Sequence, residues 1–376
     1  MRTKNFYNII FLVLSFIFLL SCAEHKDSND LLNNKSKNLN INVLLNATEF
    51  DELFKIKNKI DLKGLLLGKI IRLKIFPDGD IGVIDASTKQ LNIFNSNGIF
   101  LNTIGANGRG PGEYLNATDF AFDDSLNTYI LDAVLYQLLC YSKSGEYKWT
   151  LKLDTYNEHM IIANNNIYFY STLNMIDRPC GVCYSIKNKN KLFEFAEPTP
   201  FIKAMIKSRN LSLAVNSNSI EYYQNKLYLI HPYQYAIREF NLFGKETKLM
   251  HESSNYFIEY DSSKEFNPIS ITPKEYFNSA TNGIKIWNDL IFLSFLSIEK
   301  NKLYLDIYNL EGKKVIQNTI ALPEKYFDRK DYFPLWVDIN DHFYASYLNL
   351  NDVEKQYGGN PTIIQYEFSP QIKTKK

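Results

Sequence analysis

The chain has 376 residues, a formal net charge of +1, and 15% aromatic residues. The chain is nearly neutral and does not have the excess of basic residues that is typical of nucleic-acid-binding proteins, so no nucleic-acid partner is expected. The length exceeds that of a usual single-core domain, which leaves either several domains or a repeat architecture. Aromatic residues are favoured in strands that pack face to face, so the composition indicates a β-rich protein.

The N-terminus has the features of a bacterial secretory signal. Arg2 and Lys4 precede an apolar run over residues 9–20, which is shorter than the roughly 20 residues that span a bilayer comfortably. The run ends in Leu19-Leu20-Ser21-Cys22, which resembles a lipobox, whose cysteine thiol accepts a diacylglyceryl group. We therefore predict a signal peptide over residues 1–21 and lipidation at Cys22. The alternative is an ordinary signal peptide with a coincidental cysteine.

The lipid would anchor the protein to a membrane without a transmembrane helix. Residues 22–40 are rich in Asn, Lys, Ser and Asp, a composition that predicts a flexible tether. Residues 41–376 are expected to form the folded part. The expected location is the bacterial cell envelope, with the anchor in the outer membrane and the protein facing either the periplasm or the surface.

A short pattern recurs in the folded part: an aromatic residue, Asn or Ser, two further residues, and Gly. Four full copies end at Gly98, Gly145, Gly244 and Gly312. A weaker copy begins at Tyr184, with Asn188 at the glycine position, and another begins at Phe368 and has no glycine. Glycine readily adopts the left-handed backbone of a tight turn, so each copy predicts the turn of a β-hairpin.

The six aromatic residues that begin these copies lie 43 to 68 residues apart, and a four-stranded propeller blade needs about 40–50 residues before insertions. We therefore predict an all-β, six-bladed β-propeller with four-stranded antiparallel blades. The predicted blades cover residues 68–105, 117–153, 160–196, 213–252, 284–323 and 333–372, with an insertion near Phe257–Ala280. The segment Ile41–Ile60 would add a strand to the last blade and close the ring. A two-sheet sandwich is the alternative.

A glycine-rich loop, Gly105–Tyr114, follows the first predicted blade. It would cross from the fourth strand of one blade to the first strand of the next. In an antiparallel meander this crossover lies on the face opposite the repeated turns, beside the loops that follow each second strand. Asp85, Asp132 and His231 each precede their turn glycine by thirteen residues, so they are expected on the same face as the loop. Loops around a rigid scaffold are common binding sites.

These residues resemble the six-bladed β-propeller lipoproteins of bacteria, which are akin to TolB-like and NHL-type propellers. The resemblance is carried by the Gly-x-Gly-Pro-Gly-Glu-Tyr run that ends at Tyr114, and by Cys22 as the lipoprotein start. It covers the mature chain and is sharpest over the first two blades. It implies the fold and the envelope location more than a function, because members of this family mostly lack a defined biochemical activity.

The candidate ligand-binding residues all belong to the predicted loop face: Arg109, Glu113, Tyr114, Asp85, Asp132 and His231. Arg109 can pair with an anionic group, and Glu113 can accept a hydrogen bond from a hydroxyl or an amine. In the structural alternative Glu113 caps backbone N–H groups, Arg109 bridges two blades, and the two aspartates cap their own loops.

The pair Cys180 and Cys183 has redox-motif spacing but not the helical context of a thioredoxin-like site. A local disulfide or two free thiols is the expectation there.

We expect a ligand-binding or partner-binding envelope protein, the partner being an envelope protein or a carbohydrate or peptide ligand. The alternative is a metal-dependent lyase or hydrolase at the central channel, with His231 and channel-facing carboxylates as ligands. A third possibility is an assembly role in an envelope complex. The sequence identifies no catalytic residue, no metal site and no cofactor, and it leaves open whether a reaction is catalysed.

Overall fold

The computed structural model describes residues 46–172, 178–200, 202–203, 219–251, 253–259, 279–327, 331–347 and 360–370. All of them belong to the unit Ile41–Lys376. The predicted signal peptide, Cys22 and the tether therefore lie outside the described residues, as does most of the insertion expected near Phe257–Ala280. In the part of the chain that is described, no helix is long and apolar enough to cross a membrane.

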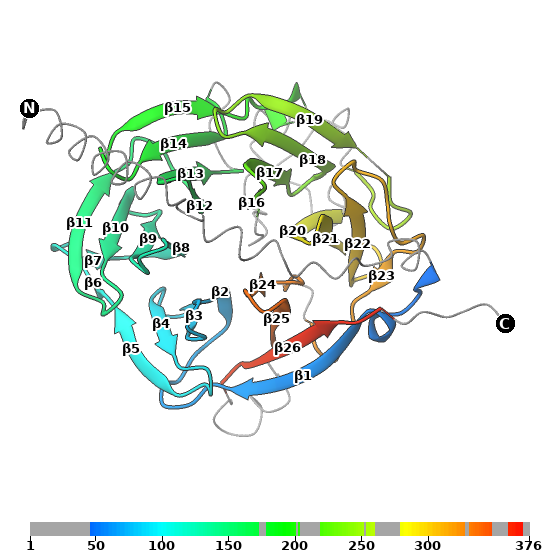
Figure 1. Cartoon of the computed structure of the whole chain (residues 1–376), viewed down its shortest axis with the longest axis horizontal. Helices are drawn as coiled ribbons and strands as arrows, with labels where there is room; N and C mark the ends of the chain where they lie inside the picture. Colours follow the sequence, from blue (N-terminus) through cyan, green and yellow to red (C-terminus); the bar gives the residue numbers. More distant parts are fainter. Residues whose placement is uncertain are drawn as a thin grey trace, which may run out of the picture. The chain divides into compact units, whose positions relative to one another are not determined.

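Six four-stranded antiparallel sheets are arranged in a ring, which confirms the predicted six-bladed β-propeller (Figure 1). Blade 1 consists of β2 (Ile70–Ile75), β3 (Ile81–Asp85), β4 (Leu91–Phe94) and β5 (Phe100–Ile104). Blade 2 consists of β8 (Ala117–Phe122), β9 (Thr128–Asp132), β10 (Gln137–Tyr141) and β11 (Tyr147–Lys152). Blade 3 consists of β12 (His159–Ala163), β13 (Asn166–Tyr170), β14 (Gly181–Ser185) and β15 (Lys191–Phe195).

The other three blades complete the ring. Blade 4 consists of β16 (Ile220–Tyr223), β17 (Lys226–His231), β18 (Gln234–Asn241) and β19 (Glu246–His251). Blade 5 consists of β20 (Ser279–Trp287), β21 (Leu290–Ser297), β22 (Lys302–Asn309) and β23 (Ile320–Ala321). Blade 6 combines β24 (Trp336–Val337), β25 (His342–Tyr347) and β26 (Thr362–Phe368) with an N-terminal strand, β1 (Phe54–Asp61).

Strand β1 closes the ring, as predicted from its position before the first blade. It pairs antiparallel with β26 from Phe54 opposite Phe368 to Asp61 opposite Thr362. A 3-10 turn, η3 (Phe50–Glu52), precedes β1. The ring of Phe54 lies 4.7 Å from Phe333 and 5.0 Å from Phe368, centroid to centroid. Closure therefore combines a full strand ladder with aromatic packing, and it leaves β26 no open edge.

The repeated turns have the predicted left-handed glycines. Gly98, Gly145, Gly244 and Gly312 have φ between 79° and 86°, a region that residues with a Cβ rarely adopt. In the third blade the expectation that Asn188 takes the glycine position is wrong, because Lys189 is the left-handed residue, with φ 54°. That turn is one residue longer, since the Ser185 N–H donates to the Asn190 carbonyl five residues on.

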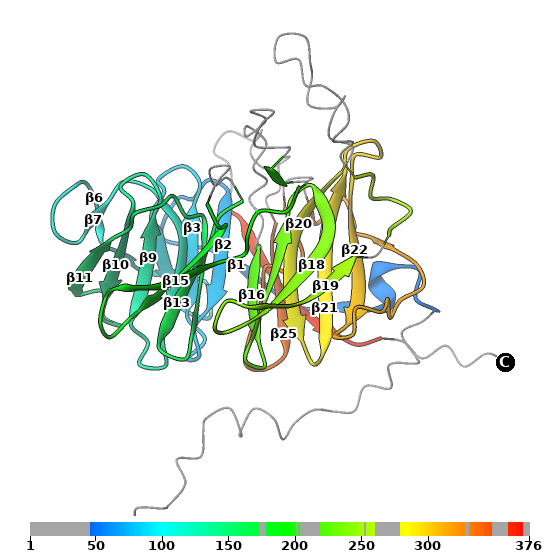
Figure 2. The same ribbon diagram turned by 90° about the horizontal axis from the view of Figure 1, so that it is seen from above.

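Strand order fixes which residues face the centre of the ring. The first strands, β2, β8, β12, β16, β20 and β24, lie nearest the ring axis, and the fourth strands lie at the rim (Figure 1). The strands run across the thickness of the ring (Figure 2). We call the two faces the turn face, with the first-to-second and third-to-fourth strand turns, and the crossover face, with the connections between blades.

Candidate functional site

The glycine-rich loop lies at the rim of the ring, beside β11 (Figure 1). Its two short strands, β6 (Ala106–Asn107) and β7 (Glu113–Tyr114), pair in parallel. Glu113 Oε2 accepts a hydrogen bond of 2.7 Å from the Gly110 N–H, so this carboxylate caps its own loop. A Cβ at Gly108 would come within 2.0 Å of the same oxygen. The glycines thus allow the loop to close tightly around Glu113.

The other two loop candidates have opposite environments. Tyr114 is fully buried, and its hydroxyl donates to the Ile104 carbonyl at 2.6 Å and accepts from the Leu91 N–H at 3.1 Å. Burial raises the pKa of this hydroxyl to about 12. Arg109 is exposed and has no hydrogen bond or ion pair with any described residue. Tyr114 therefore belongs to the core of the blade, and Arg109 is the loop residue that remains accessible.

Asp85 and Asp132 hold equivalent structural positions at the ends of β3 and β9. Asp132 Oδ2 accepts from the Leu115 N–H at 2.8 Å, and its Oδ1 accepts from the Val134 N–H at 3.0 Å. Asp85 repeats the arrangement with the N–H groups of Gly68 and Thr88. Each aspartate is at most 1% exposed and ties the crossover entering its blade to the loop that follows its second strand.

His231 occupies the corresponding position at the end of β17 and is also buried. Burial lowers the pKa of its imidazole to about 4, so the ring is neutral near pH 7. The described residues contain no group of three or more His, Cys, Asp or Glu side chains that could hold a metal ion. The structure therefore distributes the sequence-predicted candidates over the rim loop and three separate blades and does not gather them into one site.

The cysteines Cys140, Cys180 and Cys183 are all free and buried. Burial raises the pKa of the Cys180 thiol to about 11 and that of the Cys183 thiol to about 12. Of the two expectations for this pair, two free thiols is therefore the one observed. Thiols held in their protonated form are poor nucleophiles.

A separate group of side chains, which we call the axial cluster, lies in the first strands around the ring axis. Every blade contributes to it: Arg72 and Lys74 from β2, Asp119 from β8, His159 from β12, Glu221 from β16, Lys285 from β20, and Trp336 from β24. The side chains of its two carboxylates are no more than 6% exposed. Charged groups are rarely buried so deeply unless they are paired or serve a function.

Asp119 joins the two cations of blade 1. Its Oδ1 lies 3.1 Å from Lys74 Nζ and 3.7 Å from Arg72 Nε, and its Oδ2 accepts from the Met160 N–H at 2.9 Å. Burial by itself would raise the pKa of Asp119, but Lys74 and Arg72 outweigh it and hold that pKa below its ordinary value. Asp119 is thus an ionised carboxylate at the centre of the ring.

Lys285 and Glu221 form the second buried pair. Lys285 Nζ lies 2.6 Å and 3.1 Å from the two carboxylate oxygens of Glu221. The same ammonium is 4.1 Å from the centroid of the Trp336 ring, and Lys74 Nζ is 5.8 Å from it. The indole therefore faces two ammonium groups, a contact that is strengthened when it is removed from water.

His159 completes the cluster as a neutral group. An Arg72 Nη2–H donates to His159 Nδ1 at 3.0 Å, so the ring must present a lone pair there. Burial, and then the charge of Arg72, lower the pKa of His159 to about 3. Three basic side chains (Arg72, Lys74 and Lys285) then face two carboxylates, one more than the carboxylates can pair with, although burial lowers the pKa of Lys74 against the opposing effect of Asp119.

Two buried donors of the axial cluster also make no hydrogen bond, although Arg72 Nε is ion-paired with Asp119 Oδ1 at 3.7 Å. Arg72 Nε and Trp336 Nε1 make no hydrogen bond with any residue of the chain that the structure describes. A buried donor left unsatisfied costs about 1–3 kcal/mol, so such groups call for an explanation. An anionic group at this position would balance the surplus of basic side chains and accept hydrogen bonds from these N–H groups.

None of these axial residues is among the candidates predicted from the sequence. The sequence feature that could have indicated them is a charged residue at every second position in the first strand of a repeat, as with Arg72 and Lys74 of β2. In a propeller that alternation places one set of side chains toward the axis.

The neutral His159 predicts acid sensitivity. Because its folded pKa of about 3 lies below the ordinary 6.5, the unfolded chain binds a proton between these pH values that the folded chain does not. The free energy of unfolding should therefore fall as pH drops below 6.5, by up to about 1.4 kcal/mol per pH unit for this group. His231 adds a second contribution of the same sign, down to about pH 4.

Urea unfolding at several pH values would measure this dependence. His159→Gln retains an acceptor for Arg72. It should reduce the pH dependence of the free energy of unfolding by the contribution of one proton. An unaltered pH slope in His159→Gln would contradict the assignment.

Comparison with known proteins adds a family and a fold. The family model of a domain of unknown function, DUF4934, matches residues 63–374. A predicted exported protein from Bacteroides fragilis aligns with a TM-score of 0.61 at 13% identity, over 86% of this chain and 98% of its own. A DUF4221-family member from Bacteroides vulgatus aligns with a TM-score of 0.56 at 10% identity, over 85% and 99%. These identities show a shared fold alone. No curated protein matches the sequence.

Proposed function

For this chain, which belongs to the DUF4934 family, we propose a lipid-anchored protein of the bacterial cell envelope that binds a small anionic ligand at the axial cluster. The observation that carries this proposal is the excess of basic side chains over carboxylates in a cluster to which all six blades contribute, together with the buried Trp336 N–H, which has no acceptor among the described residues. Guanidinium and indole N–H groups suit carboxylate or phosphate oxygens. A closer relationship to TolB-like or NHL-type propellers is part of the proposal and rests on the glycine-rich loop.

The axial cluster supports ligand binding better than the glycine-rich loop does. In the loop, Glu113 is occupied by the Gly110 N–H and Tyr114 is in the core, which leaves Arg109 as a single exposed charge. The metal-dependent lyase or hydrolase would need His231 beside several carboxylates, and the described residues provide no such donor set.

Anion binding is testable with inorganic phosphate, sulfate and acetate at constant ionic strength. We expect saturable binding of at least one of them by isothermal titration calorimetry. The midpoint of thermal unfolding should rise in parallel. The bound anion should add about 2.7 kcal/mol to the free energy of unfolding when the free anion reaches a hundred times its dissociation constant.

Trp336→Phe tests the site, because it removes the unpaired N–H while keeping an aromatic ring against Lys285. This variant should weaken binding by about tenfold, the effect of losing one charge-assisted hydrogen bond. Trp149→Phe, on the rim strand β11, is the matched control and should bind like the unaltered protein. Equal binding by both variants, or no saturable binding of any of the three anions, would refute the proposal.

The anchor has its own test. Cys22→Ala removes the only thiol of the proposed lipobox, so the protein should move from the membrane fraction to the soluble fraction on immunoblots. Cys140→Ala, at a buried cysteine of the propeller, should leave the protein in the membrane fraction. The exported B. fragilis relative agrees with a location outside the cytoplasm. Persistent membrane fractionation of Cys22→Ala would show that the lipobox prediction is wrong.

A further inference from the structure

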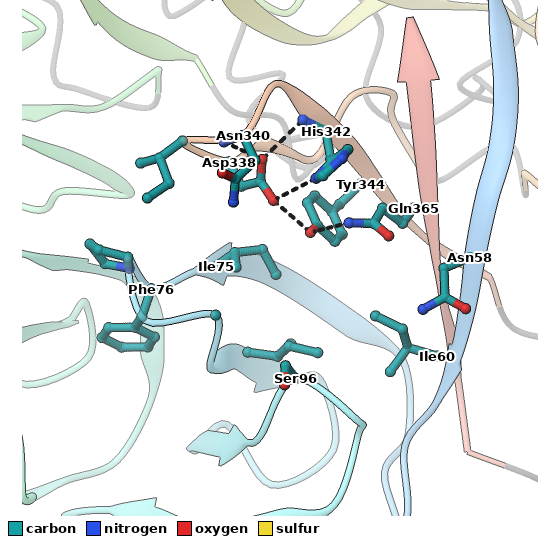
Figure 3. A pocket seen from close by; sticks show the side chains of 14 residues that line it. Asn58, Ile60, Ile75, Phe76, Ser96, Asp338, Asn340, His342, Tyr344 and Gln365 are labelled. Carbon is teal, nitrogen blue, oxygen red and sulfur yellow. Dashed lines mark hydrogen bonds and ion pairs between the residues drawn. The ribbon is translucent and has the colours of Figure 1, made fainter. Parts of the chain in front are cut away.

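A pocket of about 190 Å³ lies between blade 6 and blade 1 on the turn face, beside the strand that closes the ring (Figure 3). We call it the seam pocket. Asn58 and Ile60 of β1, Gln365 of β26, Ile75 of β2 and Ser96 of a blade 1 turn line it. The seam pocket is distinct from the axial cluster, with which it shares no residue.

The ionisable groups of the seam pocket are occupied by one another. Asp338 Oδ1 accepts from the N–H groups of Asn340 and His342, and its Oδ2 accepts from the Tyr344 hydroxyl at 2.7 Å (Figure 3). His342 Nδ1 lies 3.2 Å from the same Oδ2, and Lys57 Nζ lies 2.5 Å from His342 Nε2. The pocket therefore offers a ligand neither an unpaired carboxylate nor an unpaired ammonium group.

The same arrangement occurs in blade 2 and marks these contacts as structural. Asp123 accepts from the Tyr129 hydroxyl at 2.8 Å and from the Asn127 amide at 2.8 Å. Lys148, at a bulge of the fourth strand, donates to the side-chain Oδ1 of Asn127 at 2.5 Å. Asn127 thus stands where blade 6 has His342. The aspartate, tyrosine and lysine together form a turn-stabilising network, and ligand recognition must come from other groups of the seam pocket.

Those other groups are neutral and have unused hydrogen-bonding capacity. Asn58 Nδ2, Ser96 Oγ and Gln365 Oε1 have no hydrogen-bond partner among the described residues. They surround apolar surface formed by residues such as Ile60 and Ile75 (Figure 3). A site of this kind matches a ligand with hydroxyl groups around an apolar ring face, since amides and hydroxyls both donate and accept.

The size of the pocket narrows the class of ligand further. An engineered cavity of about 150 Å³ accepts benzene, whereas pockets for drug-sized ligands begin near 300 Å³. The 190 Å³ of the seam pocket thus suit one substituted six-membered ring.

We infer that the seam pocket binds a neutral, hydroxyl-bearing ring of the size of one sugar residue. Asn58, Ser96 and Gln365 supply the hydrogen bonds, and the isoleucine side chains contact the carbon–hydrogen face of the ring. This site is independent of the anion site, because its recognition groups are uncharged and come from the turn-face seam.

Saturation-transfer NMR with the methyl glycosides of glucose, galactose and mannose would test the inference. We expect saturable binding of at least one glycoside, and no competition from acetate at the same concentration. Competition by acetate as strong as that by a second glycoside would overturn the neutral-ligand assignment. Absence of saturable binding for all three glycosides would overturn the inference itself.

Three variants locate the binding. Ser96→Tyr fills the pocket from an exposed turn and should weaken binding by tenfold or more, about 1.4 kcal/mol. Asn97→Tyr, the next residue of the same turn and not part of the lining, is the matched control and should bind like the unaltered protein. Asn58→Leu keeps the approximate volume and removes the amide, so it should also weaken binding. Unchanged affinity in both Ser96→Tyr and Asn58→Leu would place the ligand elsewhere and refute the inference.

Discussion

Replacing Asp119 with alanine should lower the free energy of unfolding by about 3–5 kcal/mol, the usual effect of removing one partner of a buried charge pair. The variant would leave Arg72 and Lys74 close together around the axis without the carboxylate that they share. It would also leave the Met160 N–H without its acceptor. Because the side chain of Asp119 is only 2% exposed, water cannot replace these contacts without opening the ring.

Asp78→Ala provides the matched control. Asp78 also pairs with a lysine, Lys143, at 2.6 Å, but the two side chains are 34% and 55% exposed. Solvent screens such a pair, so its removal should change stability by about 0–1 kcal/mol. Urea unfolding of both variants at pH 7 would measure the difference. Equal losses for Asp119→Ala and Asp78→Ala would mean that water reaches the axial cluster freely, which contradicts the burial on which the anion proposal depends.

The six blades could be predicted from the sequence because their turns constrain single residues. Four turns each require a glycine in a left-handed conformation: Gly98, Gly145, Gly244 and Gly312. The spacing of these glycines along the sequence therefore indicates the spacing of the hairpins. The blade 3 turn shows the limit of this reasoning. Its extra residue moves the left-handed position from Asn188 to Lys189, and a single sequence does not reveal such a change in turn length.

The candidate site could not be predicted in the same way. Arg72 and Lys74 alternate with apolar residues along β2, and in an isolated antiparallel strand that alternation indicates a solvent-exposed face. Only closure into a ring converts this face into a buried axis, where Asp119 from the neighbouring blade reaches the same cations. Contacts between blades depend on strand register, which the repeat pattern leaves undetermined.

The polar residues chosen from the sequence illustrate the converse problem. Asp85, Asp132 and Glu113 have the chemistry of ligand-binding residues, but each accepts hydrogen bonds from nearby backbone N–H groups. Tight loops leave many N–H groups unpaired, and short acidic side chains satisfy them efficiently. A carboxylate beside a glycine-rich turn is therefore weaker evidence of a ligand site than a carboxylate in the first strand of a blade.

Phe54→Ala should be the most damaging single change to ring closure. Phe54 is 1% exposed, and its ring has aromatic neighbours from η3, blade 5 and blade 6: Phe50, Phe292, Phe333, Phe343 and Phe368. Truncation would remove the transfer free energy of a phenyl ring and leave a cavity, together about 3–5 kcal/mol. Because β1 has only β26 as a sheet partner, the loss falls on the strand that joins the two ends of the ring.

Urea unfolding followed by circular dichroism would give the free-energy change, and hydrogen exchange of the β1 and β26 amides would show where it acts. We expect these amides to exchange faster than those of β9 and β10 in blade 2, whose ladder Phe54 does not touch. Phe243→Ala, at a side chain 85% exposed, should change stability by no more than about 0.5 kcal/mol. If Phe54→Ala were as stable as Phe243→Ala, the strand ladder alone would close the ring, and the aromatic cluster would contribute little to closure.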